Sequence, residues 1–186
     1  SPEKKKPASR KEENLPELDP KVIFKSLLPE INKHSKTCIG ITTEKVAPSK
    51  STSSKFGGLP HFPIDAEYPL DEKGNPMRLL AQLNFAEMPP LKPYPTEGLL
   101  QIYLSEKDEL FGLDFDNPTQ QDNWRMLFFE NTDFEARTDL AELFKTDWEV
   151  SPLTISPLSL NFEQKQDIPF PHTLEFDKQL HHLFEG

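Results

Sequence analysis

Proline constrains this chain more than any other residue. The 186 residues include 19 prolines but only 7 glycines, and this proline usage is about twice the average. Because proline lacks a backbone N–H and fixes φ, it interrupts helix interiors and the hydrogen-bond ladders of central strands. The sequence therefore predicts short strands joined by stiff loops rather than long helices. Hydrophobic residues make up only 35% of the chain, so the 14 phenylalanines must supply much of the core.

Alternation of side-chain type predicts two matching strands, Leu79–Phe85 and Leu99–Leu104. They share the pattern Leu-x-Gln-apolar-x-apolar, which places Gln82 and Gln101 at equivalent positions. Residues two apart lie on the same face of a strand. Equivalent pairing would therefore put both glutamines on the same side of one sheet.

Three further segments are predicted to be strands. Residues 37–43 are short and rich in β-branched residues. Residues 110–116 alternate, which would point Phe111, Leu113 and Phe115 inward. Residues 124–129 (WRMLFF) are apolar on both faces, a pattern that favours a central strand. Two prolines within 147–162 suit edge strands, and four prolines within 88–95 predict a stiff connection.

Helices are expected to be few and peripheral. Asp19 followed by Pro20 is typical of a helix start, and apolar residues then recur at helical spacing, with a kink or restart expected at Pro29. Short helices are also predicted at 138–144 and 173–184. Residues 1–18 are charged and nearly free of apolar groups, so they are predicted to be a disordered or loose tail. The expected fold is α+β, mainly antiparallel β (a roll-like sheet) with a few peripheral helices.

The segment SSKFGGLPHFP (residues 53–63) contains the first candidate site. Two adjacent glycines, Gly57 and Gly58, predict a tight turn in which one of them has a positive φ or lies close to another backbone. Lys55 beside them suggests a phosphate cradle, but the P-loop pattern is absent and prolines follow in place of a helix. A structural turn is therefore the preferred interpretation. Lys55, Gly57, Gly58 and His61 are kept as candidate binding residues.

Gln82 and Gln101 complete the set of candidates. Each lies among apolar neighbours, and a buried amide needs hydrogen-bond partners. The two side chains either bond to each other and to backbone, or form the polar floor of a binding groove.

No catalytic residue can be assigned from the sequence. Asp114 and Asp116 resemble part of a calcium loop, but Pro118 stands where a ligand or glycine is needed. The single cysteine, Cys38, excludes an intramolecular disulfide and a cysteine-based zinc site, and it is expected to pack as a small hydrophobe. We expect no metal and no cofactor.

Charge is distributed unevenly along the chain. Residues 1–55 hold 12 Lys/Arg against 7 Asp/Glu, a net charge of +5, whereas residues 56–186 hold 9 against 24, a net charge of −15. A body this acidic repels phosphate backbones, so nucleic-acid binding is disfavoured. No apolar run approaches the roughly 18 residues of a membrane span, so no membrane association is expected and a cytoplasmic location is predicted.

Three ordered blocks resemble the YwqG-like family of bacterial proteins. They are SKFGGLPxxP (54–63), RLLAQLNF (78–85) and GLLQIY (98–103), and FGLD (111–114) follows them. The resemblance implies a predominantly β fold, with no agreed activity or catalytic residues. YwqG-like proteins are usually longer, so residues 19–186 are expected to be one domain lacking its C-terminal block, with exposed core and an unpaired strand edge.

Three functions remain open at this stage. The preferred hypothesis is a binding or interaction module without catalytic activity, whose protein or small-molecule partner is unknown. The first alternative is a small-ligand-binding protein or an enzyme with its site near the Gly57-Gly58 turn. The second is an acidic, immunity-type protein that masks a basic partner.

Overall fold

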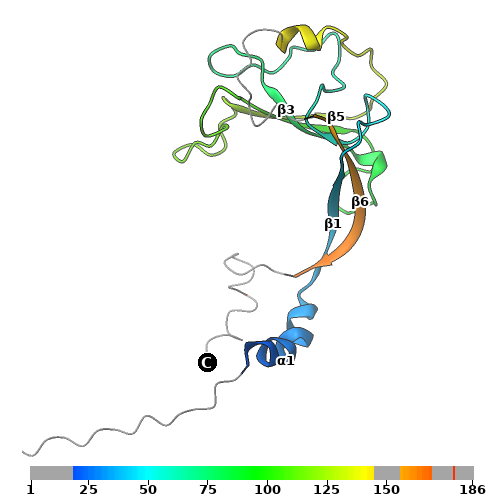
Figure 1. The fold of residues 1–186 in the computed structure, drawn as a ribbon, viewed down its shortest axis with the longest axis vertical. Coiled ribbons are helices and arrows are strands. Elements are labelled where there is room, and N and C mark those ends of the chain that lie inside the picture. Colours follow the sequence, from blue (N-terminus) through cyan, green and yellow to red (C-terminus); the bar gives the residue numbers. More distant parts are fainter. Residues whose placement is uncertain (1–18, 145–155, 169–177, 179–186) are drawn as a thin grey trace, which may run out of the picture. The chain divides into compact units, whose positions relative to one another are not determined.

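The computed structural model describes residues 19–144, 156–168 and 178 (Figure 1). The chain divides into two compact units, Ser1–Lys36 with Asp167–Gly186, and Thr37–Gln166. The tail predicted at 1–18 lies outside the described residues. So does the helix predicted at 173–184, apart from Lys178.

Helix α1 (Pro20–Lys33) belongs to the first unit and begins where the sequence predicts. The Asp19 carboxylate accepts a hydrogen bond from the Lys21 N–H at 2.9 Å, and Pro20 occupies the start of the helix. The prediction of a restart at Pro29 is wrong, because α1 is one helix through this position. The missing N–H of Pro29 removes one intrahelical hydrogen bond, and this loss does not end the helix.

The second unit contains a six-stranded antiparallel sheet with the strand order β1-β6-β2-β3-β4-β5. Two 3-10 helices, η1 (Phe85–Glu87) and η2 (Leu140–Phe144), accompany it, and η2 confirms the short helix predicted at 138–144. The expectation of a mainly antiparallel α+β fold is therefore confirmed. The strands are β1 (Lys36–Glu44), β2 (Lys55–Phe56), β3 (Arg78–Asn84), β4 (Leu99–Leu104), β5 (Trp124–Phe129) and β6 (Leu158–Asp167).

The register of β3 against β4 confirms the predicted match between the two strands. Gln82 is directly opposite Gln101, and Leu79 is opposite Tyr103. An irregularity between Leu79 and Ala81 shifts the pairing by one residue. Because of this bulge, Leu79 and Gln82 lie on the same face of the sheet although they are three residues apart.

Three strand predictions are corrected by the structure. Strand β5 lies at the edge of the sheet rather than at its centre, and its Met126 and Phe128 side chains remain 47% and 45% exposed. Strand β6 lies between β1 and β2 rather than at an edge. Pro157 comes before the strand begins at Leu158, so it does not interrupt the hydrogen-bond ladder. Residues 110–116 form turns instead of a strand, since Phe111 (φ 52°) and Gly112 (φ 88°) both adopt left-handed conformations.

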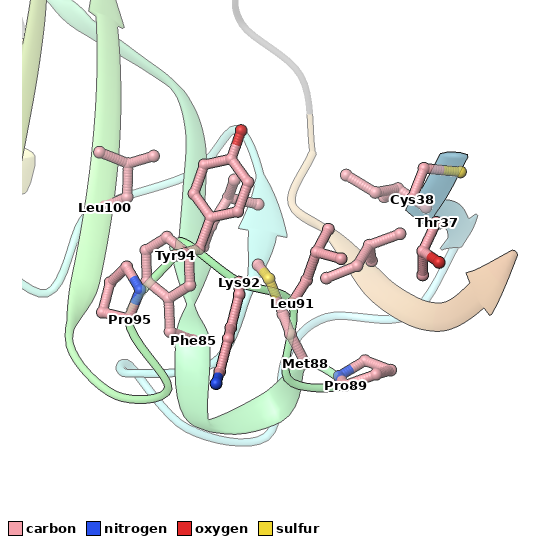
Figure 2. Close-up of a pocket in the computed structure, with 13 residues that line it drawn as sticks. Thr37, Cys38, Phe85, Met88, Pro89, Leu91, Lys92, Tyr94, Pro95 and Leu100 are labelled. Carbon is pink, nitrogen blue, oxygen red and sulfur yellow. The ribbon is translucent and has the colours of Figure 1, made fainter. Parts of the chain in front are cut away.

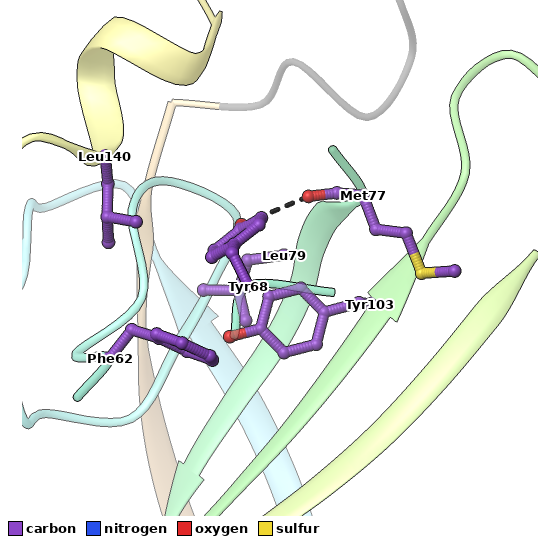
Figure 3. Close-up of a cluster of buried hydrophobic side chains, with 6 residues drawn as sticks. All are labelled: Phe62, Tyr68, Met77, Leu79, Tyr103 and Leu140. Carbon is purple, nitrogen blue, oxygen red and sulfur yellow. Dashed lines mark hydrogen bonds between the residues drawn. The ribbon is translucent and has the colours of Figure 1, made fainter. Parts of the chain in front are cut away.

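The hydrophobic core packs on the face of the sheet that carries the glutamines (Figure 3). Leu79 of β3 and Tyr103 of β4 form its base, and residues from the β2–β3 connection and from η2 cover them. The Tyr68 hydroxyl donates to the Met77 carbonyl at 3.1 Å, so this buried hydroxyl is satisfied. Burial raises the pKa of both Tyr68 and Tyr103. The core residues are Phe62, Tyr68, Met77, Leu79, Tyr103 and Leu140.

Candidate functional site

The two glutamines are adjacent, fully buried and hydrogen-bonded to each other. Gln101 Nε2 donates to Gln82 Oε1 at 2.9 Å, and neither residue has exposed surface. Tyr103 completes the row, because its hydroxyl donates to Gln101 Oε1 at 2.6 Å. The prediction that both glutamines lie on one side of one sheet is confirmed.

The remaining bonds of the glutamine pair hold the 51–61 segment against the sheet. Gln82 Nε2 donates to the carbonyls of Ser51 (2.8 Å) and Ser53 (2.9 Å). Gln82 Oε1 also accepts the backbone N–H of His61 at 2.8 Å, and Gln101 Nε2 donates to the His61 carbonyl at 2.7 Å. The two amides therefore satisfy backbone groups that no strand pairs, which is one of the two roles expected for them.

His61 is held on both ring nitrogens. Its Nε2 lies 3.1 Å from the Thr132 carbonyl, which can only accept, so Nε2 carries the hydrogen. In the neutral ring Nδ1 then accepts from the Ser51 hydroxyl at 3.0 Å. The ring also stacks on Phe134 at a centroid distance of 4.6 Å. These contacts give His61 a packing role between the 51–61 segment and the chain that follows β5.

Lys55 has altered acid–base chemistry. Lys55 is only 4% exposed, and its Nζ donates to the Ser51 carbonyl at 2.9 Å. Burial lowers the pKa of Lys55 from 10.5 to about 8, and the nearby Glu87 carboxylate opposes this change. Glu87 in turn accepts the Ser54 N–H at 2.8 Å. An amine with this pKa is partly unprotonated near neutral pH, which makes it a better nucleophile than an exposed lysine.

The Gly57-Gly58 pair forms the predicted turn. Both residues have positive φ, 69° and 72°, and the Gly57 N–H donates to the Leu80 carbonyl at 3.0 Å. A Cβ on Gly58 would lie 3.0 Å from the Pro157 Cβ, which is a tight contact. Positive φ and close approach therefore both explain the choice of glycine here.

The loop between β4 and β5 exposes large apolar side chains among carboxylates. Leu110, Phe111, Leu113 and Phe115 are all exposed, Phe115 by 80%. Hydrogen bonds keep the loop ordered: the Asp108 carboxylate accepts from the N–H groups of Leu110 and Gly112, and Asp114 accepts from Asp116 and Asn117. We call residues 108–116 the acidic loop. No group of three or more His, Cys, Asp and Glu residues in the described part of the chain is arranged to hold a metal ion.

An apolar cavity lies on the face of the sheet opposite the glutamines. Leu83 and Leu100 directly follow and precede the two glutamines in their strands, so their side chains point to the other face. With Ile39 of β1 and residues of the 85–95 connection they enclose about 430 Å³. We call this space the sheet groove. In Figure 2, Met88 and Leu91 lie between the β1 residues and the rings of Phe85 and Tyr94.

The six predicted candidates and these two surface features occupy different places. Lys55, Gly57, Gly58, His61, Gln82 and Gln101 do come together around β2, β3 and β4, but none of them lines the sheet groove. Sequence reasoning misses the groove because four prolines within 88–95 indicate only a connection. It missed the acidic loop because the alternation of 110–116 also fits a strand. The glycine at 112, next to exposed apolar residues, is the signal that favours a loop.

The chain belongs to a protein family described as a domain of unknown function (DUF1963). The family model matches residues 54–185, which include the glycine turn, both glutamines and the acidic loop. No curated protein matches the chain significantly. In the described residues, no helix is long and apolar enough to cross a membrane.

Proposed function

We propose that this domain is a binding or interaction module without catalytic activity, and that the acidic loop docks a basic, apolar surface of a partner protein. The observation that carries the proposal is the exposure of four large apolar side chains within six residues. Contiguous exposed apolar groups are rare on monomeric proteins and mark interaction sites. The flanking carboxylates, among them Asp108 and Asp114, favour a cationic partner by charge complementarity.

Backbone strain in the acidic loop supports the same proposal. Phe111 has a φ of 52°, and a non-glycine residue in this region is uncommon. A Cβ on Gly112 would lie 2.8 Å from the Asn123 carbonyl oxygen, so the loop returns closely onto the chain before β5. Strained, ordered loops of this kind cluster at functional sites.

The experiment uses an amphipathic Lys/Leu peptide as a defined cationic partner and a Glu/Leu peptide of the same pattern as its counterpart. We expect the Lys/Leu peptide to bind and the Glu/Leu peptide not to bind. Binding should weaken strongly between about 0.01 M and about 1 M salt, because the Debye length falls from roughly 30 Å to 3 Å. Equal binding of both peptides contradicts the proposal.

A matched pair of variants locates the surface. Phe115→Ser should weaken peptide binding about tenfold or more, since burying a phenylalanine is worth roughly 1.5–3 kcal/mol. Val46→Ser removes another exposed apolar group, 60% exposed, from the loop between β1 and β2 and should leave the affinity unchanged. Equal effects of the two substitutions would place the peptide elsewhere.

We also infer that the chain is a YwqG-like protein of bacterial origin, and the three ordered sequence blocks support this. The cytoplasmic location stays a prediction, which fractionation of the source cells would test.

A further inference from the structure

We propose that the sheet groove binds an amphiphile with an anionic head group, such as a fatty-acid carboxylate. No residue of the acidic loop is among the groove's lining residues, so this inference is independent of the proposed function. Its volume of about 430 Å³ falls within the range of small-molecule sites, roughly 300–1,000 Å³. Ile39, Leu83, Met88, Leu91 and Leu100 provide the apolar lining that suits a hydrocarbon chain.

One wall of the groove is stiff before any ligand arrives. The 85–95 connection contributes Phe85, Met88, Leu91 and Tyr94, and four prolines lie within residues 88–95. Tyr94 and Ile41 remain 59% and 44% exposed although both line the cavity. A preorganised wall lowers the entropy cost of binding, and a ligand would cover side chains that water now reaches.

The charge lining the groove indicates the head group. Lys92 is the lysine of the lining, and its ammonium makes no hydrogen bond or ion pair with another described residue. Two other cavities contain carboxylates: Asp108 and Asp114 line one, and Glu87 lines the other. Among the described residues, no carboxylate lines the sheet groove. An anion therefore finds a complementary charge only here among these three cavities.

The direct test compares dodecanoate, dodecanol and dodecyltrimethylammonium below their micelle concentrations by calorimetry. Dodecanoate should bind most tightly. Shortening the chain to decanoate should weaken binding about fourfold for each methylene lost. Circular dichroism before and after titration must show the same fold. Equal affinity for the three head groups, or no binding of dodecanoate, overturns the proposal.

Charge reversal locates the head group. Lys92→Glu should reverse the preference, so that dodecyltrimethylammonium binds more tightly than dodecanoate. Lys73→Glu makes the same charge change on an exposed turn and should leave the preference unchanged. Similar shifts in both variants would show a general effect of net charge and overturn the assignment. A chain that forms a dimer in solution and does not bind dodecanoate would assign the groove to a second copy of the chain, which also overturns the proposal.

Discussion

Replacing Lys55 by methionine should stabilise the protein at neutral pH, although it removes a hydrogen bond. The pKa of Lys55 falls from 10.5 to about 8 on burial. Since one pKa unit is worth about 1.4 kcal/mol, keeping this lysine charged costs roughly 3 kcal/mol at pH 7. Methionine has a similar length and no charge. The lost hydrogen bond to the Ser51 carbonyl is worth about 1 kcal/mol.

The two groups that Lys55 approaches keep other partners in this variant. The Ser51 carbonyl still accepts from Gln82 Nε2, and the Glu87 carboxylate still accepts the Ser54 N–H. We therefore expect the free energy of unfolding to rise by about 2 kcal/mol at pH 7, the burial cost minus the hydrogen bond. Urea denaturation followed by circular dichroism measures this difference. Lys73→Met, which changes an exposed lysine, is the control and should have no effect.

The pH dependence separates this explanation from a general gain in packing. The pKa of Lys55 is lower in the folded state than in the unfolded chain, so the unfolded chain binds more protons between about pH 8 and pH 10.5. Stability of the parent protein therefore rises with pH through this window. Between about pH 7 and about pH 9.5, Lys55 should raise the free energy of unfolding of the parent protein by roughly 2 kcal/mol. The difference in stability between the variant and the parent should shrink by the same amount.

The upper pH limit comes from two tyrosines. Burial raises the pKa of Tyr68 and Tyr103, so the unfolded chain loses their protons first and stability falls above about pH 10. Measurements up to pH 9.5 avoid this effect. A Lys55→Met protein that is less stable than the parent at pH 7, with a pH dependence equal to that of the parent, would refute the reasoning. It would show that the ammonium and Glu87 stabilise the fold as a pair.

Three further predictions test the turn, the amides and the acidic loop. Gln82→Leu should lower the free energy of unfolding by about 1–3 kcal/mol in urea, because the His61 N–H and the Ser53 carbonyl lose their partner; unchanged stability would show that these groups need none. Gly58→Val should lower the free energy of unfolding by roughly 1–3 kcal/mol, and by more than Gly74→Val does. Both glycines have positive φ, but only Gly58 also has a close neighbour, Pro157. Equal losses in the two variants would leave backbone strain as the sole cause. Phe111→Gly should change stability by less than about 1 kcal/mol, since relief of strain offsets lost burial, while it weakens binding of the Lys/Leu peptide; intact binding would contradict a docking role.

Local patterns determined much of the sheet. The alternation in 79–85 and 99–104 predicts β3 and β4, and the matched glutamines predict their shared face, because period two is a property of the strand backbone itself. Gly57-Gly58 predicts a turn for an equally local reason. Both residues have positive φ, a conformation that glycine adopts readily because it has no Cβ.

Strand order is not contained in such patterns. WRMLFF is apolar on both faces whether or not another strand covers it, and only the assembled sheet places β5 at the edge. The same holds for β6, whose position between β1 and β2 brings residues more than a hundred positions apart into one ladder. Ser159 of β6, for instance, is paired with Lys55 of β2.

The sequence by itself therefore determined β3 and β4, the glycine turn and the amides that need partners. The tertiary structure alone decided that the glutamine face is closed and that the opposite face holds a groove. Closure of the first face depends on the His61 backbone reaching Gln82 and Gln101 across the sheet, and the groove depends on Ile39 lying near Leu83 and Leu100. These contacts join segments far apart in the chain, so no window of neighbouring residues carries the information that specifies them.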